Sequence, residues 1–244
     1  MNNNNILYVF LVITCVACKT VSVEQDLYHK ALSSVVLGAI GEQKDFVLKH
    51  SYKNIALPNY KNRLKIQITV IPFTKSTFRA YNQAKVTRKN DFSVEYSDSL
   101  KIKPKFLKIE LSDRVEVLNA LNSSFNHDIK QYIQHKKQSQ IVLGVLMVLK
   151  PEDLNTIENA HEVFLEREGL NSYALKLYKN SELEQTILFD EGVVFGYQRS
   201  SFCWQEDSMR QLSIVDLVDG DAKCPRYTYR NFRRAHKKIN YFKL

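Results

Sequence analysis

Apolar residues recur along this chain with two different periods, and the two periods predict two kinds of element. Apolar and polar residues alternate over residues 64–70, as is typical of a half-buried strand. Residues 141–149 are almost continuously apolar, as expected of a strand buried on both faces. Further strands are predicted over residues 92–96, 106–111, 173–178, 186–189, 193–204 and 212–218, with turns at residues 190–192 and 219–220.

Three segments show helical spacing instead. Residues 24–40 carry apolar side chains along one face, and Gly41 is well placed to end that N-terminal helix. Asp113 can cap a central helical segment, with Glu116 three residues on, which reaches about Lys137 as one helix or as two. Pro151 suits the first turn of a third helix that runs to Gly169.

These elements together predict an α+β fold. The sheet is expected to be mainly antiparallel, with the N-terminal helix, the central helical segment and one strand-helix-strand unit over residues 141–178 that has a right-handed crossover. An apolar content of 44% and a charged content of 25% are ordinary for a globular protein. We therefore expect residues 18–244 to form a single domain, with a basic C-terminal segment at 226–244.

The first residues predict export. Residues 6–17 are twelve residues without a charge, which is the length of a signal-peptide hydrophobic region. A membrane-spanning helix needs about 20 such residues, and Lys19 ends the run too early. Residues 1–17 are therefore predicted to be a signal peptide that is removed.

The end of this leader, Cys15-Val16-Ala17-Cys18, resembles the lipobox of bacterial lipoprotein precursors. The resemblance implies that Cys18 receives the lipid and becomes the first residue of a chain anchored in the cell envelope. Two features depart from the family pattern: Cys15 stands where Leu is usual, and the start has no Lys or Arg. Cleavage after Ala17 by an ordinary signal peptidase, giving a secreted soluble protein, stays open, as does a retained anchor.

Two cysteines remain in the body, Cys203 and Cys224. A pair of cysteines in an exported chain predicts a disulfide, which here would fasten the basic C-terminal segment to the body. Cys203 as a catalytic nucleophile is the alternative, but it lacks a recognisable local signature.

The charge of the chain is unevenly distributed. Residues 44–108 carry 15 basic and 4 acidic side chains, whereas residues 109–225 carry 11 and 19. Either the two parts attract each other within one fold, which we favour, or one of them faces a charged partner.

The C-terminal segment interleaves basic residues with aromatic ones. Such a pattern binds anions, and an exported protein meets anionic lipids or acidic glycans rather than nucleic acid. The candidate anion-binding residues are Arg226, Arg230, Arg233, Arg234, Lys237 and Lys238. In the alternative interpretation, Tyr227, Tyr229 and Phe232 pack as a last strand and the cations are solvated or face the acidic half.

Recognisable catalytic and cofactor motifs are absent from the sequence: there is no phosphate-binding glycine loop, nucleophile elbow, zinc-protease helix or paired cysteine knuckle. The acidic residues around Gly220 do not match a calcium loop, because Val215, Leu217 and Arg226 occupy ligand positions. We therefore expect no catalytic residue, no cofactor and no metal site.

The sequence favours a non-catalytic binding or structural module tethered to a membrane of the cell envelope. One alternative is an exported hydrolase whose site combines distant residues such as Glu206, Asp207, His161 or His236. Another is a subunit of an envelope assembly, which would expose an apolar patch.

Overall fold

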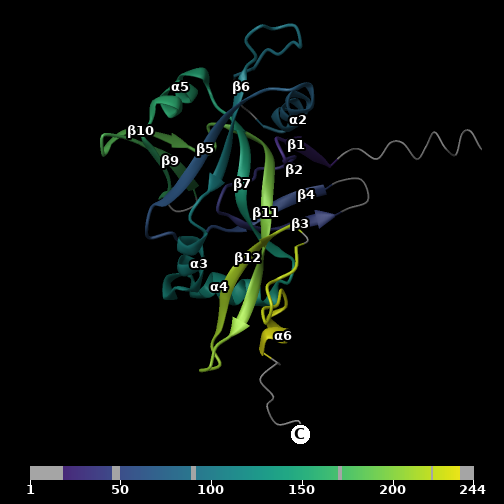
Figure 1. The fold of residues 1–244 in the computed structure, drawn as a ribbon, viewed down its shortest axis with the longest axis vertical. Coiled ribbons are helices and arrows are strands. Elements are labelled where there is room, and N and C mark those ends of the chain that lie inside the picture. The colour runs from purple at the N-terminus through teal and green to yellow at the C-terminus, as the bar shows by residue number, and fades with distance from the viewer. Residues whose placement is uncertain (1–18, 46–49, 89–91, 170–171, 221, 237–244) are drawn as a thin grey trace, which may run out of the picture.

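The computed structural model describes residues 19–45, 50–88, 92–169, 172–220 and 222–236. The described residues form one large sheet with helices at its periphery (Figure 1). In spatial order its strands are β1 (Thr20–Val23), β2 (Asp26–Lys30), β11 (Val193–Glu206), β7 (Ser139–Val148), β6 (Lys105–Leu111), β5 (Leu64–Pro72), β8 (Glu162–Glu168), β9 (Ser172–Lys179) and β10 (Glu182–Leu188).

Three strands lie off this path. β12 (Leu212–Asp219) pairs with β11, and β3 (Ile40–Asp45) pairs both with β7 and with β4 (His50–Ala56). Every strand pair among the described residues is antiparallel. The predicted α+β class with a mainly antiparallel sheet is therefore confirmed.

The helices are short. They are α2 (Lys75–Lys85), α3 (Arg114–Asn122), α4 (His127–His135), α5 (Pro151–Asn159) and α6 (Phe232–His236), with a 3-10 turn, η1 (Ser124–Asn126), between α3 and α4. The Asp113 side chain accepts a hydrogen bond from the Glu116 amide at 2.9 Å, as predicted for a helix cap. The central helical segment is thus two helices, and the first of them ends before Ser123. None of the helices in the described part of the chain is long and apolar enough to cross a membrane.

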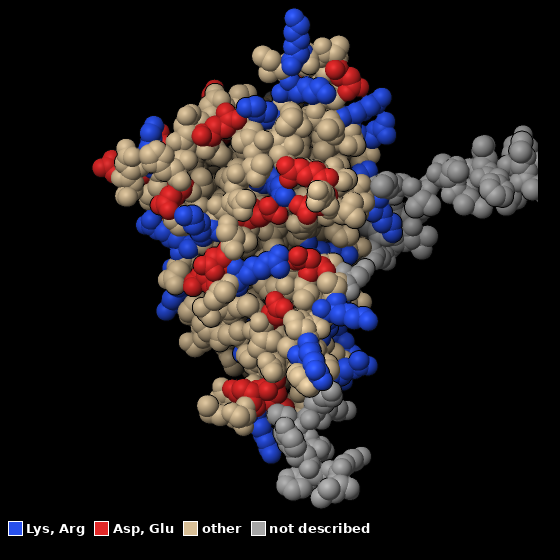
Figure 2. All heavy atoms as spheres, in the orientation of Figure 1, with Lys and Arg blue, Asp and Glu red and all other residues tan. Residues whose placement is uncertain are grey.

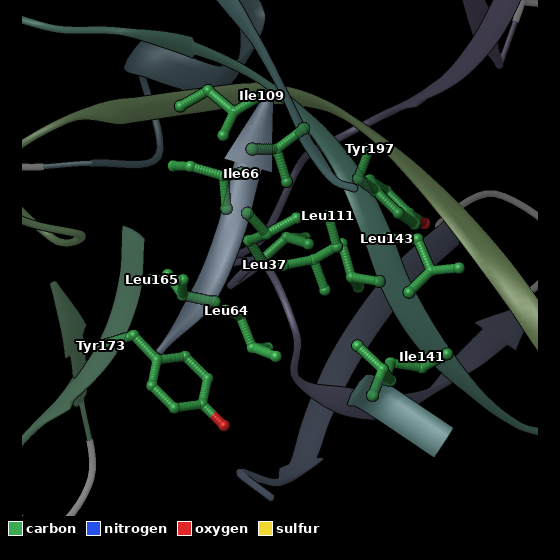
Figure 3. Close-up of a cluster of buried hydrophobic side chains, with 14 of the residues drawn as sticks. Leu37, Leu64, Ile66, Ile109, Leu111, Ile141, Leu143, Leu165, Tyr173 and Tyr197 are labelled. Carbon is green, nitrogen blue, oxygen red and sulfur yellow. The ribbon is translucent and has the colours of Figure 1, made fainter. Parts of the chain in front are cut away.

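The alternation along the strands places one set of apolar residues in a large core. On β5, Leu64 and Ile66 are buried whereas Lys65 and Gln67 are exposed. Figure 3 shows these two residues facing Ile109, Leu111 and Leu165 from neighbouring strands. A second, smaller core lies where α2 packs on β11 and β1, and it includes Phe73, Tyr81, Phe106 and Phe195.

The predicted N-terminal helix over residues 24–40 is wrong. Residues 20–30 form the β1–β2 hairpin, in which Glu24 adopts a φ of +54° in the turn. Leu27, expected on the buried face, is exposed, and Tyr28 is buried in its place. The backbone of this segment pairs with β11, and the Ala31 amide donates to the Phe195 carbonyl at 3.0 Å. Such pairing with a distant strand outweighs a weak local helical pattern.

The predicted strand-helix-strand unit is right in both its strands, β7 and β9, and in the start of its helix, but the second half of the helix and the crossover are wrong. The helix ends at Asn159 instead of Gly169, and residues 162–168 form β8, in which Val163 and Leu165 are buried at alternate positions. β6 and β5 lie between β7 and β8, and successive antiparallel pairings make β7 and β8 antiparallel. β9 runs in the same direction as β7, but β6, β5 and β8 separate the two strands, so they are not neighbours joined by a crossover helix.

The region before β6 also differs from the prediction. Residues 92–96 are irregular, and α2 occupies a segment where no helix was predicted. The Thr74 hydroxyl accepts from the Thr77 amide and the Thr77 hydroxyl accepts from the Thr74 amide, so two threonines form the capping box. The usual sequence signal has Glu or Gln at the second position, which is why this helix start was missed.

Ion pairs join the basic and acidic parts of the chain, which supports the interpretation that they attract each other. Arg63 pairs with Glu166 at 3.1 Å and Lys65 with Glu162 at 3.0 Å. Lys105 on β6 pairs with Glu158 on α5 at 2.7 Å. Each pair has one partner in residues 44–108 and the other in the acidic half, so part of the charge asymmetry is satisfied internally.

Lys108 is a buried cation that holds the β1–β2 hairpin against β6. Its Nζ lies 2.6 Å from Asp26, 3.4 Å from Glu110 and 3.5 Å from Glu24. Burial lowers the pKa of Lys108, but the hydrogen bond to Asp26 and the charge of Glu110 outweigh it, so the pKa lies above its ordinary value. Lys108 therefore stays charged and neutralises part of this carboxylate cluster.

We expect Lys108→Met to lower the free energy of unfolding by about 1 kcal/mol at neutral pH. The loss is smaller than for a fully buried ion pair, because solvent screens the exposed carboxylates. The loss should shrink towards about pH 4, because protonated carboxyls no longer repel one another. Urea unfolding at the two pH values measures both effects. Lys105→Met removes an exposed cation from the same strand, and an equal, pH-independent loss in the two variants would contradict the prediction.

Candidate anion-binding site

The C-terminal segment is fastened to β11 at two adjacent points. Cys203 and Cys224 form the predicted disulfide, with Cα atoms 5.7 Å apart. Beside it, Trp204 and Tyr229 exchange two backbone hydrogen bonds of 2.8 and 2.9 Å. Tyr229 thus makes a single antiparallel bridge, whereas Phe232 belongs to the short helix α6, so the alternative of a last strand is only partly realised.

This attachment completes a polar hollow of about 400 Å³. We call it the basic hollow; its lining residues are Gln43, Lys137, Gln138, Gln140, Arg199, Ser201 and Arg230. They come from β3, the turn after α4, β7, β11 and the C-terminal segment. Among the residues that the structure describes, the lining includes three cations and no acidic side chain, so the hollow favours an anion.

Arg199 is held in place from two sides. Its Nε donates to His29 Nε2 at 3.3 Å, and its Nη1 donates to Gln140 Oε1 at 2.6 Å. Gln140 Nε2 in turn contacts the Ser201 hydroxyl at 3.1 Å. The network orients the guanidinium, which presents donors in a planar fork suited to carboxylate or phosphate.

Tyr52 supports this network through the backbone of Gln140. Its hydroxyl donates to the Gln140 carbonyl at 2.9 Å, and its ring lies 5.2 Å from the ring of Tyr197. Burial raises the pKa of Tyr52, so the phenol stays neutral and continues to donate.

Arg230 is oriented by backbone carbonyls. Its Nη2 donates to the carbonyls of Gly220 at 2.8 Å and Ala222 at 2.6 Å. Within the described residues, Arg199, Arg230 and Lys137 have no ion pair with a carboxylate. The three charges are therefore available to a ligand.

The acidic side chain opposite Ser200 on the β11–β12 pair faces away from the hollow. Asp219 lies opposite Ser200, accepts a hydrogen bond from its hydroxyl and pairs with Arg114 at 3.1 Å. Successive residues of a strand point to opposite faces, so Asp219 lies on the face opposite to Arg199 and Ser201.

Of the six predicted anion-binding residues, the structure places Arg230 in the hollow. Arg226 lies over the ring of Tyr227 at 4.9 Å. Arg233 and Arg234 belong to α6 and are exposed. Lys237 and Lys238 lie outside the described residues.

Sequence reasoning missed Arg199 and Lys137. A signal for Arg199 exists, because residues 198–201 are a polar run between two apolar stretches of the same 14-residue strand. Lys137 shows no such signal, since one lysine in a turn is unremarkable.

The residues proposed for a hydrolase are not all brought together. His236 Nδ1 lies 3.0 Å from Glu206, but Asp207 accepts from the Met209 and Gln211 amides and so shapes the β11–β12 turn. His161 precedes β8, which three strands separate from β11, a spacing of about 19 Å.

No protein-family model matches this chain, and no curated protein matches it either.

Proposed function

We propose that this chain is an exported lipoprotein, cleaved before Cys18 and tethered to a membrane of the cell envelope, that acts as a non-catalytic binding module. Its ligand is an acidic glycan whose carboxylate or phosphate enters the basic hollow. One observation carries the binding site: Arg199, Arg230 and Lys137, from three separate elements, converge on a polar hollow in which no described lining residue is acidic.

The chemistry of the lining favours a sugar over an acyl chain. The Gln138 amide and the Ser201 hydroxyl are polar groups suited to hydrogen bonds with sugar hydroxyls, and the described lining lacks large apolar side chains. The volume lies within the range of small-ligand sites. A single acidic sugar unit is therefore the ligand class that matches both the charge and the size.

A uronic acid oligosaccharide is the probe for this proposal, with glycerol phosphate as a lipid-headgroup comparison. We expect Arg199→Gln/Arg230→Gln to weaken binding of the oligosaccharide about 100-fold, because each charge-assisted contact contributes about 1.5–3 kcal/mol. Titration calorimetry at low and high salt measures the affinity, which should fall as salt screens the charges.

The matched control is Arg226→Gln/Arg234→Gln, which removes the same charge outside the hollow. It should bind nearly as tightly as the unmodified chain. Equal losses in the two double variants would refute a built site, and preference for glycerol phosphate would replace the glycan by a lipid headgroup.

A further inference from the structure

One face of α2 is directed outwards and carries cations. Lys75, Arg79, Asn82, Gln83 and Val86 follow at helical spacing and line a groove of about 630 Å³. The opposite face, with Ala80, Tyr81 and Ala84, is buried on the small core. The helix is therefore amphipathic, and the core does not use its outer face.

The loop before β6 forms the other wall of this groove. Tyr96 from the loop lies 4.9 Å from the Phe78 ring, and Ser97 and Asp98 complete the wall. Further along, the loop exposes Ile102 between Lys101 and Lys103. Of the two acidic residues in the described part of the loop, Glu95 is exposed and Asp98 accepts a hydrogen bond from the Tyr96 hydroxyl.

Exposed apolar residues and cations thus coincide at this end of the molecule. Val86 and Ile102 are 88% and 86% exposed, more than any other large apolar side chain in the described part of the chain. Figure 2 shows basic side chains gathered over the loop and α2 at the top of the view. We call this set the α2 surface; it consists of Lys75, Arg79, Val86, Lys101, Ile102 and Lys103.

A lipid on Cys18, as proposed, would place the membrane near α2. α2 packs against β1, which begins at Thr20, two residues after Cys18. Two residues of chain span at most about 7 Å, so a lipid on Cys18 leaves no spacer between the bilayer and β1. The domain would lie against the membrane beside α2.

We infer that the α2 surface docks on an anionic phospholipid membrane. The inference rests on the proposed tether at Cys18. Lys75, Arg79, Lys101 and Lys103 face the lipid phosphates, while Val86 and Ile102 enter the interface. The basic hollow stays accessible, because its Ser201 lies six residues along β11 from Phe195 beneath α2, about 20 Å away.

The test uses the chain from residue 18 with Cys18→Ser, which contains every described residue but accepts no lipid. Sedimentation with phosphatidylcholine vesicles, with and without phosphatidylglycerol, measures binding. We expect retention only on the anionic vesicles. Lys75→Gln/Arg79→Gln/Lys101→Gln should weaken it about 100-fold, since each cation near such a surface contributes about a 5-fold gain.

Two further variants separate a specific surface from general charge attraction. Arg226→Gln/Arg233→Gln/Arg234→Gln removes the same charge elsewhere and should bind as the parent does. Ile102→Ser leaves the charge unchanged and should weaken binding several-fold, because an apolar contact is lost. Equal losses in the two triple variants, or no binding to anionic vesicles, would overturn the inference.

The proposed function fails independently of this result. Arg199→Gln/Arg230→Gln should still bind vesicles, and intact mass of the membrane-extracted protein reports whether Cys18 carries acyl chains. If the chain is unacylated but still binds anionic vesicles through the α2 surface, the proposed tether is refuted and the docking surface is supported. If the uronic oligosaccharide, and not the vesicles, binds through the α2 surface, the partner of this surface is a glycan and the inference of docking on lipid is overturned.

Discussion

Replacement of both Cys203 and Cys224 by alanine should lower the free energy of unfolding by about 3 kcal/mol, because the bridge closes a loop of 21 residues and restricts the unfolded chain. Cys203 is also fully buried on β11, so the alanine leaves unfilled space. Urea unfolding of the oxidised parent and of the double variant measures the difference.

The same replacement should also weaken ligand binding. Without the bridge, the Trp204–Tyr229 contact remains the attachment to β11 beside Arg230. Arg230 would then leave the basic hollow for much of the time, and affinity for the uronic oligosaccharide should fall towards that of an Arg230→Gln variant. The parent treated with a thiol reductant should behave like the double variant. An unchanged unfolding midpoint together with unchanged affinity would show that the bridge supports neither.

Gly41→Ala should be comparably destabilising, by about 3 kcal/mol. A Cβ at Gly41 on β3 would overlap the Lys53 carbonyl oxygen and approach two Tyr52 ring carbons to 2.6 Å. The carbonyl belongs to the paired strand β4 and cannot rotate away, so either the β3–β4 pairing opens or Tyr52 moves. Movement of Tyr52 would disturb Gln140 and hence the orientation of Arg199.

Gly144→Ala is the matched control, since Gly144 lies on β7 and its Cβ would first meet the end of the Gln198 side chain at 3.1 Å. This side chain can shift, and alanine suits a strand better than glycine, so the change should be about 1 kcal/mol or less. Thermal and urea unfolding of both variants test the contrast. Similar stabilities for the two would mean that the close approach at Gly41 is easily relieved.

Local patterns predicted those parts of the fold in which neighbouring residues decide the structure. The alternation over residues 64–70 and 106–111 identified β5 and β6, and Asp113 identified the start of α3. The presence of two cysteines after the predicted signal peptide region predicted the disulfide. Each of these inferences depends on one face of an element or on one pair of residues, so a few positions were sufficient.

The errors lie where a distant strand decides the structure. The segment 24–40 has apolar residues at spacings compatible with a helix, but β11 and β7 offer it backbone partners more than 100 residues away. Residues 162–168 likewise continue a helical pattern, yet β5 and β9 bind them as a strand. Short apolar segments fit either structure, and tertiary pairing selects between them.

The candidate site shows the same division. A basic, aromatic C-terminal segment with a cysteine before it was visible in the sequence, and so was its attachment by a disulfide. The sequence did not show which cation of the segment lies beside Arg199 and Lys137. This depends on the register of β11, on the position of Tyr229 opposite Trp204 and on the end of α4. The sequence by itself determined strands such as β5, β6 and β7, the cap of α3 and the cysteine pair, because these depend on neighbours in the chain. Only the tertiary structure decided the basic hollow and the α2 surface, because charge and exposure there depend on residues that folding brings together.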